Sequence, residues 1–348
     1  MANRPQQRNS RSNTTVTLLV ILLIAILANI FIFGTLFSDV TPRDTVNLRT
    51  SPITEHEEDQ NEAPAQNPLQ NYTPVEISSD ELHFGTLALI NGNNAYVAEG
   101  PHTVIPHETP ADVYSAKTRD YYILDTSIDL NPTVIEKLNT MFADYKAHSG
   151  SANIMINAAY RTMEQQQAIL EKKGEAIAAK PGFSEHHAGY ALDICIFENG
   201  KSRTFADEAP YIWIPENCKK YGFIRRYPDG KSATTGITFE PWHYRYVGVP
   251  HSYYITENSL VLEEYIELVR HYTLLGEHLK ITADGKNYEV YFVPAEEKMT
   301  SVYCPKDKNY TISGNNVDGF IVTVDLTEII QKEPEQPSQE VSDLNIAA

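Results

Sequence analysis

The sequence predicts an α+β fold, a mixed, mainly antiparallel sheet with helices. Two observations lead to this class. Segments of helical and of strand periodicity alternate through the middle of the chain. Two strand-like runs, the first with an Asp-Gly hairpin signal, follow near the C-terminal end. The length of 348 residues allows one large domain or two modest ones. The formal net charge of -18 argues against a nucleic-acid-binding protein, because phosphates attract basic surfaces.

An uncharged apolar run covers residues 16–37 and is long enough to cross a bilayer, which takes about 20 residues. Arg4, Arg8 and Arg11 precede it and an acidic stretch follows. The positive-inside rule therefore predicts a cytoplasmic tail at residues 1–15 and the rest of the chain outside the membrane. A cleaved signal peptide is the alternative, but its apolar region would cover only about 7–15 residues before a small-residue cleavage site. We expect a single-pass transmembrane helix that anchors the protein in the cell membrane.

Residues 38–79 are predicted to be a disordered linker. They are polar, acidic and proline-bearing, without an apolar period, so they cannot bury a core. A flexible tether of about 40 residues spans very roughly 35 Å, which lets a domain work near the membrane surface. The last residues, 327–348, have a similar composition and are expected to be a disordered tail.

Residues 80–257 are predicted to form the main domain. Gly-Asn-Asn at 92–94 indicates a turn between two short strands. In residues 131–150, apolar side chains recur on one helical face, and Gly150 follows as a stop signal. The next elements are expected in the order strand, helix, strand, helix, strand, within residues 152–161, 162–180, 188–197, 209–223 and 236–248.

Residues 258–326 have a different character. A strongly amphipathic helix is predicted within 258–278. The strand-like runs 279–295 and 319–326 come after it. We expect a closing helix and a small β appendage in this part of the chain.

One carboxylate stands in an unusual place. Asp193 lies in the apolar run 188–197, just after the pair His186 and His187. A buried charge is costly unless it is paired or bound to a metal. The strand period lets Asp193 point from the sheet into a cleft. A metal site here needs nitrogen and oxygen ligands, because no cysteines have metal-site spacing. Free, packed thiols are expected at Cys195, Cys218 and Cys304, with one disulfide bridge as the alternative.

A catalytic zinc takes three protein ligands and leaves one position for water. The best candidates are His186, Asp193 and, from a later segment, His243. Glu240 lies three residues before His243, where a carboxylate can take a proton from a metal-bound water and pass it to a leaving amine. The H-E-x-x-H pattern is absent, so this would be a different zinc scaffold.

Three blocks of sequence occur in a specific order. "AAYRTMEQQ" places Arg161 five residues before Gln166, "SEHHAGYALD" fits S-x-H-x-x-G-x-A-x-D, and "EPWH" fits E-x-W-H. Together they resemble the VanY-type D-alanyl-D-alanine carboxypeptidases, a zinc peptidase family. Ala158 and Ala159 depart from the first block, which usually begins S-G-Y-R. The resemblance covers about residues 131–265.

The resemblance implies a zinc cleft and a role for each residue of the metal site. His186, Asp193 and His243 would be the zinc ligands, with His186 selected over His187. Glu240 would act as general base and general acid. His187 would face solvent or lie behind the ligands.

The resemblance also implies residues that contact the substrate. Arg161 would polarise the scissile carbonyl and stabilise the oxyanion, a task for a fixed cation. Ser184 and Gln166 would hydrogen-bond the peptide stem, and Trp242 would form part of the pocket wall. Outside these roles, Arg225 and Arg226 are expected to form surface salt bridges, with a contact to a substrate carboxylate as the alternative.

The expected function is that of a membrane-anchored zinc carboxypeptidase that removes the terminal D-alanine from peptidoglycan stem peptides. LD-carboxypeptidase activity on the tetrapeptide stem is an alternative within the same class. A wall-binding module without catalysis is an alternative from another class, and the presence of Glu240 argues against it.

Overall fold

A computed structural model describes residues 67–97, 100, 103–175 and 177–327. The predicted cytoplasmic tail, the predicted transmembrane helix, most of the predicted linker and nearly all of the predicted C-terminal tail lie outside these residues. Within the described ranges, none of the helices combines the length and apolar character that a membrane crossing requires.

The predicted α+β class is confirmed, and a six-stranded sheet forms its centre. Strand β6 pairs antiparallel with β5 on one side and with β9 on the other. The last residues of β6 also pair antiparallel with β7. Strand β8 extends the sheet beyond β9, and the short strand β3 adds the only parallel pairing of this sheet, to β5. The strand bounds are β3 Tyr122–Ile123, β5 Ile154–Ala158, β6 Ala191–Glu198, β7 Lys201–Thr204, β8 Phe223–Arg225 and β9 His243–Tyr246.

Two predicted helices flank strand β5 in the sequence. Helix α3 (Pro132–Ser149) begins with proline in its first turn, buries the predicted apolar face and ends at Gly150, which adopts a left-handed conformation. Helix α4 (Met163–Lys173) begins with a capping box in which Thr162 and Gln165 bond each other's backbone. It is shorter than predicted because Gly174, with φ of 79° and ψ of 161°, turns the chain out of the helix.

The short 3-10 helix η2 (Glu185–Ala188) leads into β6 through Gly189. Gly189 has φ of 72°, and a Cβ there would lie 2.5 Å from Asn131 Oδ1. Only glycine fits this turn, and the turn fixes where the histidine pair stands relative to the strand.

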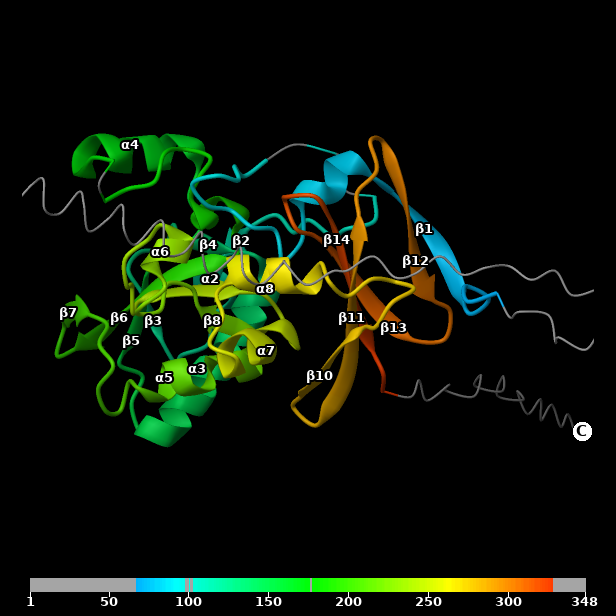
Figure 1. Ribbon diagram of the computed structural model, residues 1–348. Helices are drawn as coiled ribbons and strands as arrows, with labels where there is room; N and C mark the ends of the chain where they lie inside the picture. Colours follow the sequence, from blue (N-terminus) through cyan, green and yellow to red (C-terminus); the bar gives the residue numbers. More distant parts are fainter. Residues whose placement is uncertain (1–66, 98–99, 101–102, 176, 328–348) are drawn as a thin grey trace, which may run out of the picture. The chain divides into compact units, whose positions relative to one another are not determined.

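A second β region lies toward the C-terminal end (Figure 1). One sheet has the order β10-β11-β14-β13, and β1 pairs antiparallel with β12. Strand β1 corrects the predicted linker, which ended at residue 79. The polar composition concealed a period of two, in which Val75 and Ile77 turn inward and Ile77 is fully buried. The bounds are β1 Tyr72–Ser78, β10 Leu279–Ala283, β11 Lys286–Pro294, β12 Met299–Pro305, β13 Asn309–Gly314 and β14 Gly319–Asp325.

The predicted boundary between residues 257 and 258 does not separate two cores. Helix α8 (Leu262–Val269) buries Leu262 and Ile266 in one apolar cluster with Ile224 and Val247 of the main domain. The three cysteines are buried and free. The remaining elements are η1 Ser79–His83, β2 Ala111–Asp112, α2 Val113–Ala116, β4 Asp129–Leu130, α5 Trp213–Asn217, η3 Cys218–Tyr221, α6 Ser232–Thr235 and α7 His251–Glu257.

Candidate metal centre

Three side chains predicted as ligands converge on one point. His186 comes from η2, Asp193 from β6 and His243 from the first position of β9, and their potential ligand atoms all lie within 4.8 Å of one another. Antiparallel pairing places Asp193 directly opposite His243. Asp193 Oδ1 lies 3.0 Å from His243 Nδ1 and 3.6 Å from His186 Nε2. The sheet register therefore builds the cluster from segments far apart in the sequence.

The donor atoms in this cluster fit a catalytic zinc. His186 Nδ1 lies 2.6 Å from the Ala159 carbonyl oxygen, so Nδ1 carries the proton and Nε2 turns a lone pair toward Asp193. Asp193 Oδ1 is buried but makes no hydrogen bond to any described residue. Two imidazole nitrogens and one carboxylate oxygen, with one acceptor atom left unsatisfied, match the three-ligand set that zinc takes in open sites.

Electrostatics in the cluster favour positive charge. Burial raises the pKa of Asp193, but the two histidines outweigh it and hold that pKa well below its usual range. Burial lowers the pKa of His243, but the adjacent carboxylates of Asp193 and Glu185 outweigh burial and raise that pKa to about 9. The negative field of these carboxylates would also favour a divalent cation.

Glu240 lies beside the three ligands and outside their cluster. Its Oε2 is 3.8 Å from His243 Nδ1, and its side chain is 25% exposed. Burial raises the pKa of Glu240, and the charges of Asp193 and Glu185 add to this effect, whereas His243 opposes it. A carboxylate with a raised pKa beside a metal position is suited to accept and return a proton.

Arg161 is held at the site from two directions. Its backbone N–H donates to the His186 carbonyl at 3.2 Å, and its Nη1 donates to Gln166 Oε1 at 2.7 Å. Gln166 is itself buried, and its Nε2 donates to the Ala179 carbonyl at 2.7 Å. Gln166 thus positions Arg161, and its predicted contact with the peptide stem stays a prediction.

A cavity of about 700 Å³ opens over this cluster. It is lined by the three predicted ligands, by Arg161 and Glu240, and by the other predicted substrate residues, Ser184, Gln166 and Trp242. All eight predicted site residues therefore share one cavity. The structure also places His187 behind the site, where its Nδ1 lies 2.6 Å from the Arg161 carbonyl and its Nε2 accepts from Gly182 N–H at 3.1 Å.

Glu185 is the residue that the sequence analysis missed. It is fully buried, and its Oε1 accepts hydrogen bonds from Arg226 and Arg245, both 0% exposed. The prediction of a surface salt bridge is wrong for Arg226, while Arg225 pairs with Asp207 nearer the surface. In the sequence, the only sign of this cluster is that Glu185, Arg226 and Arg245 are charged residues within segments predicted to be buried.

Comparisons with known proteins point to one family. The VanY family model, described as D-alanyl-D-alanine carboxypeptidase, matches residues 127–249. A D-alanyl-D-alanine carboxypeptidase of Enterococcus faecium is 34% identical over 261 residues, which are 73% of this chain and 80% of that protein. The bifunctional D-Ala-D-Ala dipeptidase and carboxypeptidase VanXYC of Enterococcus gallinarum is 34% identical over 194 residues, 52% of this chain and 93% of that protein.

A solved structure extends the similarity to the fold. The vancomycin resistance D,D-dipeptidase VanXYg, in complex with a D-Ala-D-Ala phosphinate analogue, matches with a TM-score of 0.62 and 30% identity, over 73% of this chain and 99% of that one. The α+β fold, the candidate metal site and these relatives together define the class as a peptidase. The chain belongs to the VanY family of D-alanyl-D-alanine carboxypeptidases, and the predicted class, a zinc metallocarboxypeptidase, is confirmed.

Proposed function

We propose that this enzyme removes the terminal D-alanine from peptidoglycan stem peptides, with a zinc ion held by His186, Asp193 and His243. The observation that carries the proposal is the convergence of these ligands, with the unsatisfied Asp193 Oδ1, at the cavity that Arg161 and Glu240 also line. The substrate class comes from the names of the relatives, among them the carboxypeptidase of Enterococcus faecium.

The proposed mechanism divides the work among residues of this chain. A zinc ion, when bound, supplies a Lewis acid that makes a water molecule more acidic. Glu240 takes the proton from the attacking water and later gives it to the leaving amine of D-alanine. Arg161 donates to the carbonyl oxygen as negative charge develops there, while Gln166 keeps the guanidinium in place. Ser184 and Trp242 line the same cavity.

The location of the enzyme is a second part of the proposal. The apolar run 16–37 and the basic residues before it support a single membrane span with the catalytic domain outside the cytoplasm. Reporter fusions after residue 37 and after residue 327 test this topology. An external signal from both fusions supports the proposed orientation, and a cytoplasmic signal from either contradicts it. A mature chain that begins near Ser38 contradicts anchoring.

The catalytic proposal is tested with defined stem peptides. Purified enzyme is incubated with tripeptide, tetrapeptide and pentapeptide stems, with and without a chelator, and released D-alanine is measured. We expect release from the pentapeptide that stops with the chelator and returns with added zinc. Release from the tetrapeptide alone would instead support the LD-carboxypeptidase alternative, and no release from any stem would support a wall-binding module.

A further inference from the structure

A buried carboxylate stands directly behind one proposed ligand. Glu185 Oε2 lies 3.5 Å from His243 Nε2, the ring nitrogen that faces away from Asp193. This oxygen and His243 Nε2 are both buried, and neither makes a hydrogen bond to any described residue. The other oxygen, Oε1, accepts from Arg226 Nε and Arg245 Nη1, each at 2.8 Å. One end of Glu185 is therefore fixed by two arginines, and the other end faces the ligand.

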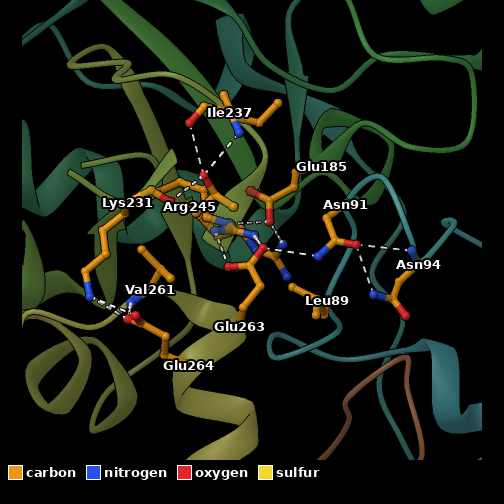
Figure 2. Close-up of polar contacts among 12 residues, drawn as sticks. Leu89, Asn91, Asn94, Glu185, Lys231, Ile237, Arg245, Val261, Glu263 and Glu264 are labelled. Carbon is orange, nitrogen blue, oxygen red and sulfur yellow. Dashed lines mark hydrogen bonds and ion pairs between the residues drawn. The ribbon is translucent and has the colours of Figure 1, made fainter. Parts of the chain in front are cut away.

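The two arginines are in turn held by other parts of the chain. Arg226 donates from Nη1 and Nη2 to both oxygens of Glu263 on α8, at 2.8 and 2.7 Å. Asn91 Nδ2 donates to Glu263 Oε1 at 3.1 Å. Arg245 Nη2 donates to the carbonyls of Thr86 and Ala88, at 3.0 and 2.9 Å. Figure 2 shows Glu185, Arg245, Glu263 and Asn91 converging on one cluster.

This cluster joins segments that the family model does not cover. Glu185, Arg226 and Arg245 lie within the matched residues 127–249, whereas Asn91 precedes them and Glu263 follows them. The contacts of α8 thus reach the metal centre in two steps, through Arg226 and then through Glu185.

Stability alone is a weak explanation for such a cluster. Desolvation offsets much of the attraction in a buried ion network, so apolar residues of similar volume stabilise a core about as well. A network of this kind does hold its members in one geometry, because each guanidinium presents its donors in a rigid fork. In metal centres, a carboxylate that accepts from the distal ring N–H of a histidine ligand fixes the tautomer and the orientation of the ring.

We propose that Glu185 is a positioning residue of the metal centre: it accepts from His243 Nε2–H and so presents Nδ1 to the metal, and Glu263 holds it there through Arg226. This inference rests on the proposed zinc ligands. It assigns to α8, outside the matched family region, a part in setting the metal affinity of the enzyme.

The test compares three carboxylate-to-amide variants in the full chain. Glu185→Gln alters the contact with His243, and Glu263→Gln alters the support of Arg226. Glu267→Gln is the matched control, because Glu267 lies on the same helix, pairs only with Arg270 among the contacts described for it, and is 62% exposed. Zinc affinity is measured by competition with a chromophoric chelator, and the visible spectrum of the cobalt-substituted protein reports ligand geometry. Unfolding of the zinc-free proteins is followed in parallel.

We expect Glu185→Gln to weaken zinc binding by about 10–100-fold and Glu263→Gln by roughly 10-fold, with altered cobalt spectra. Glu267→Gln should bind both metals as the wild type does. Unchanged zinc affinity and cobalt spectra in folded Glu185→Gln and Glu263→Gln, with only the unfolding midpoint lowered, would overturn the inference. If Glu185→Gln does not fold, the same readouts on Glu263→Gln decide. A wild-type chain that binds no zinc would overturn the proposed function itself, which distinguishes the two failures.

Discussion

At the scale of single residues, the site depends on side chains whose geometry is fixed before substrate arrives. Arg161 illustrates this, because its guanidinium is half-buried, donates to Gln166, and is tied through its backbone to His186. Burial lowers the pKa of Arg161 and the charge of Asp193 opposes this, which keeps a cation beside the proposed oxyanion position. Positive charge alone does not define the role of Arg161, since the planar guanidinium group can donate to two partners at once.

Substitution Arg161→Lys separates the effect of the planar guanidinium geometry from the effect of the charge. A lysine keeps the positive charge, but its single ammonium group cannot bond Gln166 and a carbonyl oxygen with the same geometry. We expect turnover to fall about 10²–10³-fold, the cost of losing one oxyanion donor, with zinc content unchanged. D-alanine release and metal content are measured on the same preparation. Turnover close to that of the wild type would show that charge is sufficient.

Residues with a direct chemical role could be predicted from the sequence, whereas a residue that supports them could not. His186, Asp193, His243 and Glu240 could be proposed from sequence, because they stand at characteristic positions in the blocks SEHHAGYALD and EPWH. Glu185 could not, because its partners Arg226 and Arg245 are 41 and 60 residues away. A glutamate next to a histidine is otherwise typical of an exposed position, and only the fold shows that it is buried.

At the scale of elements, the turn from η2 into β6 controls the ligand geometry. Gly189 adopts a left-handed conformation, and Asn131, at the start of α3, donates from Nδ2 to the Ala188 carbonyl at 3.1 Å. The turn therefore packs against α3 while it places His186 on one side and Asp193 on the other.

Substitution Gly189→Ala tests this turn. The added Cβ would meet Asn131 Oδ1 at 2.5 Å in addition to the unfavourable φ, so we expect a loss of more than about 1 kcal/mol in the free energy of unfolding, together with weaker zinc binding. Gly230→Ala is the control, since Gly230 has φ of 77° but open space around its Cβ position. Equal effects of both substitutions would mean that conformation alone matters and that the close contact does not.

Local signals decided which elements could be predicted. Helix α3 has a long apolar face with proline at its start and glycine after its end, so the sequence indicated both ends correctly. Strand β1 could not be predicted, because Pro74 and the acidic residues around it give this segment the composition of a linker. Its partner, β12, is more than 200 residues away, and such pairing leaves little trace in a local pattern.

At the scale of the whole molecule, the C-terminal region shares an apolar core with part of the main domain. Helix α8 buries Leu262, Tyr265, Ile266 and Val269, each at most 2% exposed, against apolar residues that include Val247. Helical periodicity revealed which face is apolar but not what covers it. The sequence therefore predicted the helix and the α+β class, whereas the shared core depends on long-range contacts.

Truncation tests this shared core. Burial of one large apolar side chain contributes about 1.5–3 kcal/mol, so losing four approaches the whole margin of about 5–15 kcal/mol that keeps a domain folded. We expect a chain that ends at residue 257 to lack a cooperative unfolding transition, and a control chain that ends at residue 327 to unfold like the full protein. A cooperative transition in the shorter chain would show that residues up to 257 fold without helix α8 and the strands after it.

The central claim is that three residues hold the metal while Glu240 moves protons without ligating it. The most direct test measures zinc content and D-alanine release from a pentapeptide stem on the same samples of Glu240→Gln and His243→Ala. We expect Glu240→Gln to keep its zinc while turnover falls about 10²–10⁴-fold, the contribution of general acid–base catalysis, and His243→Ala to lose both. If Glu240→Gln loses its zinc, or retains both zinc and normal turnover, the division of roles proposed for this site is wrong.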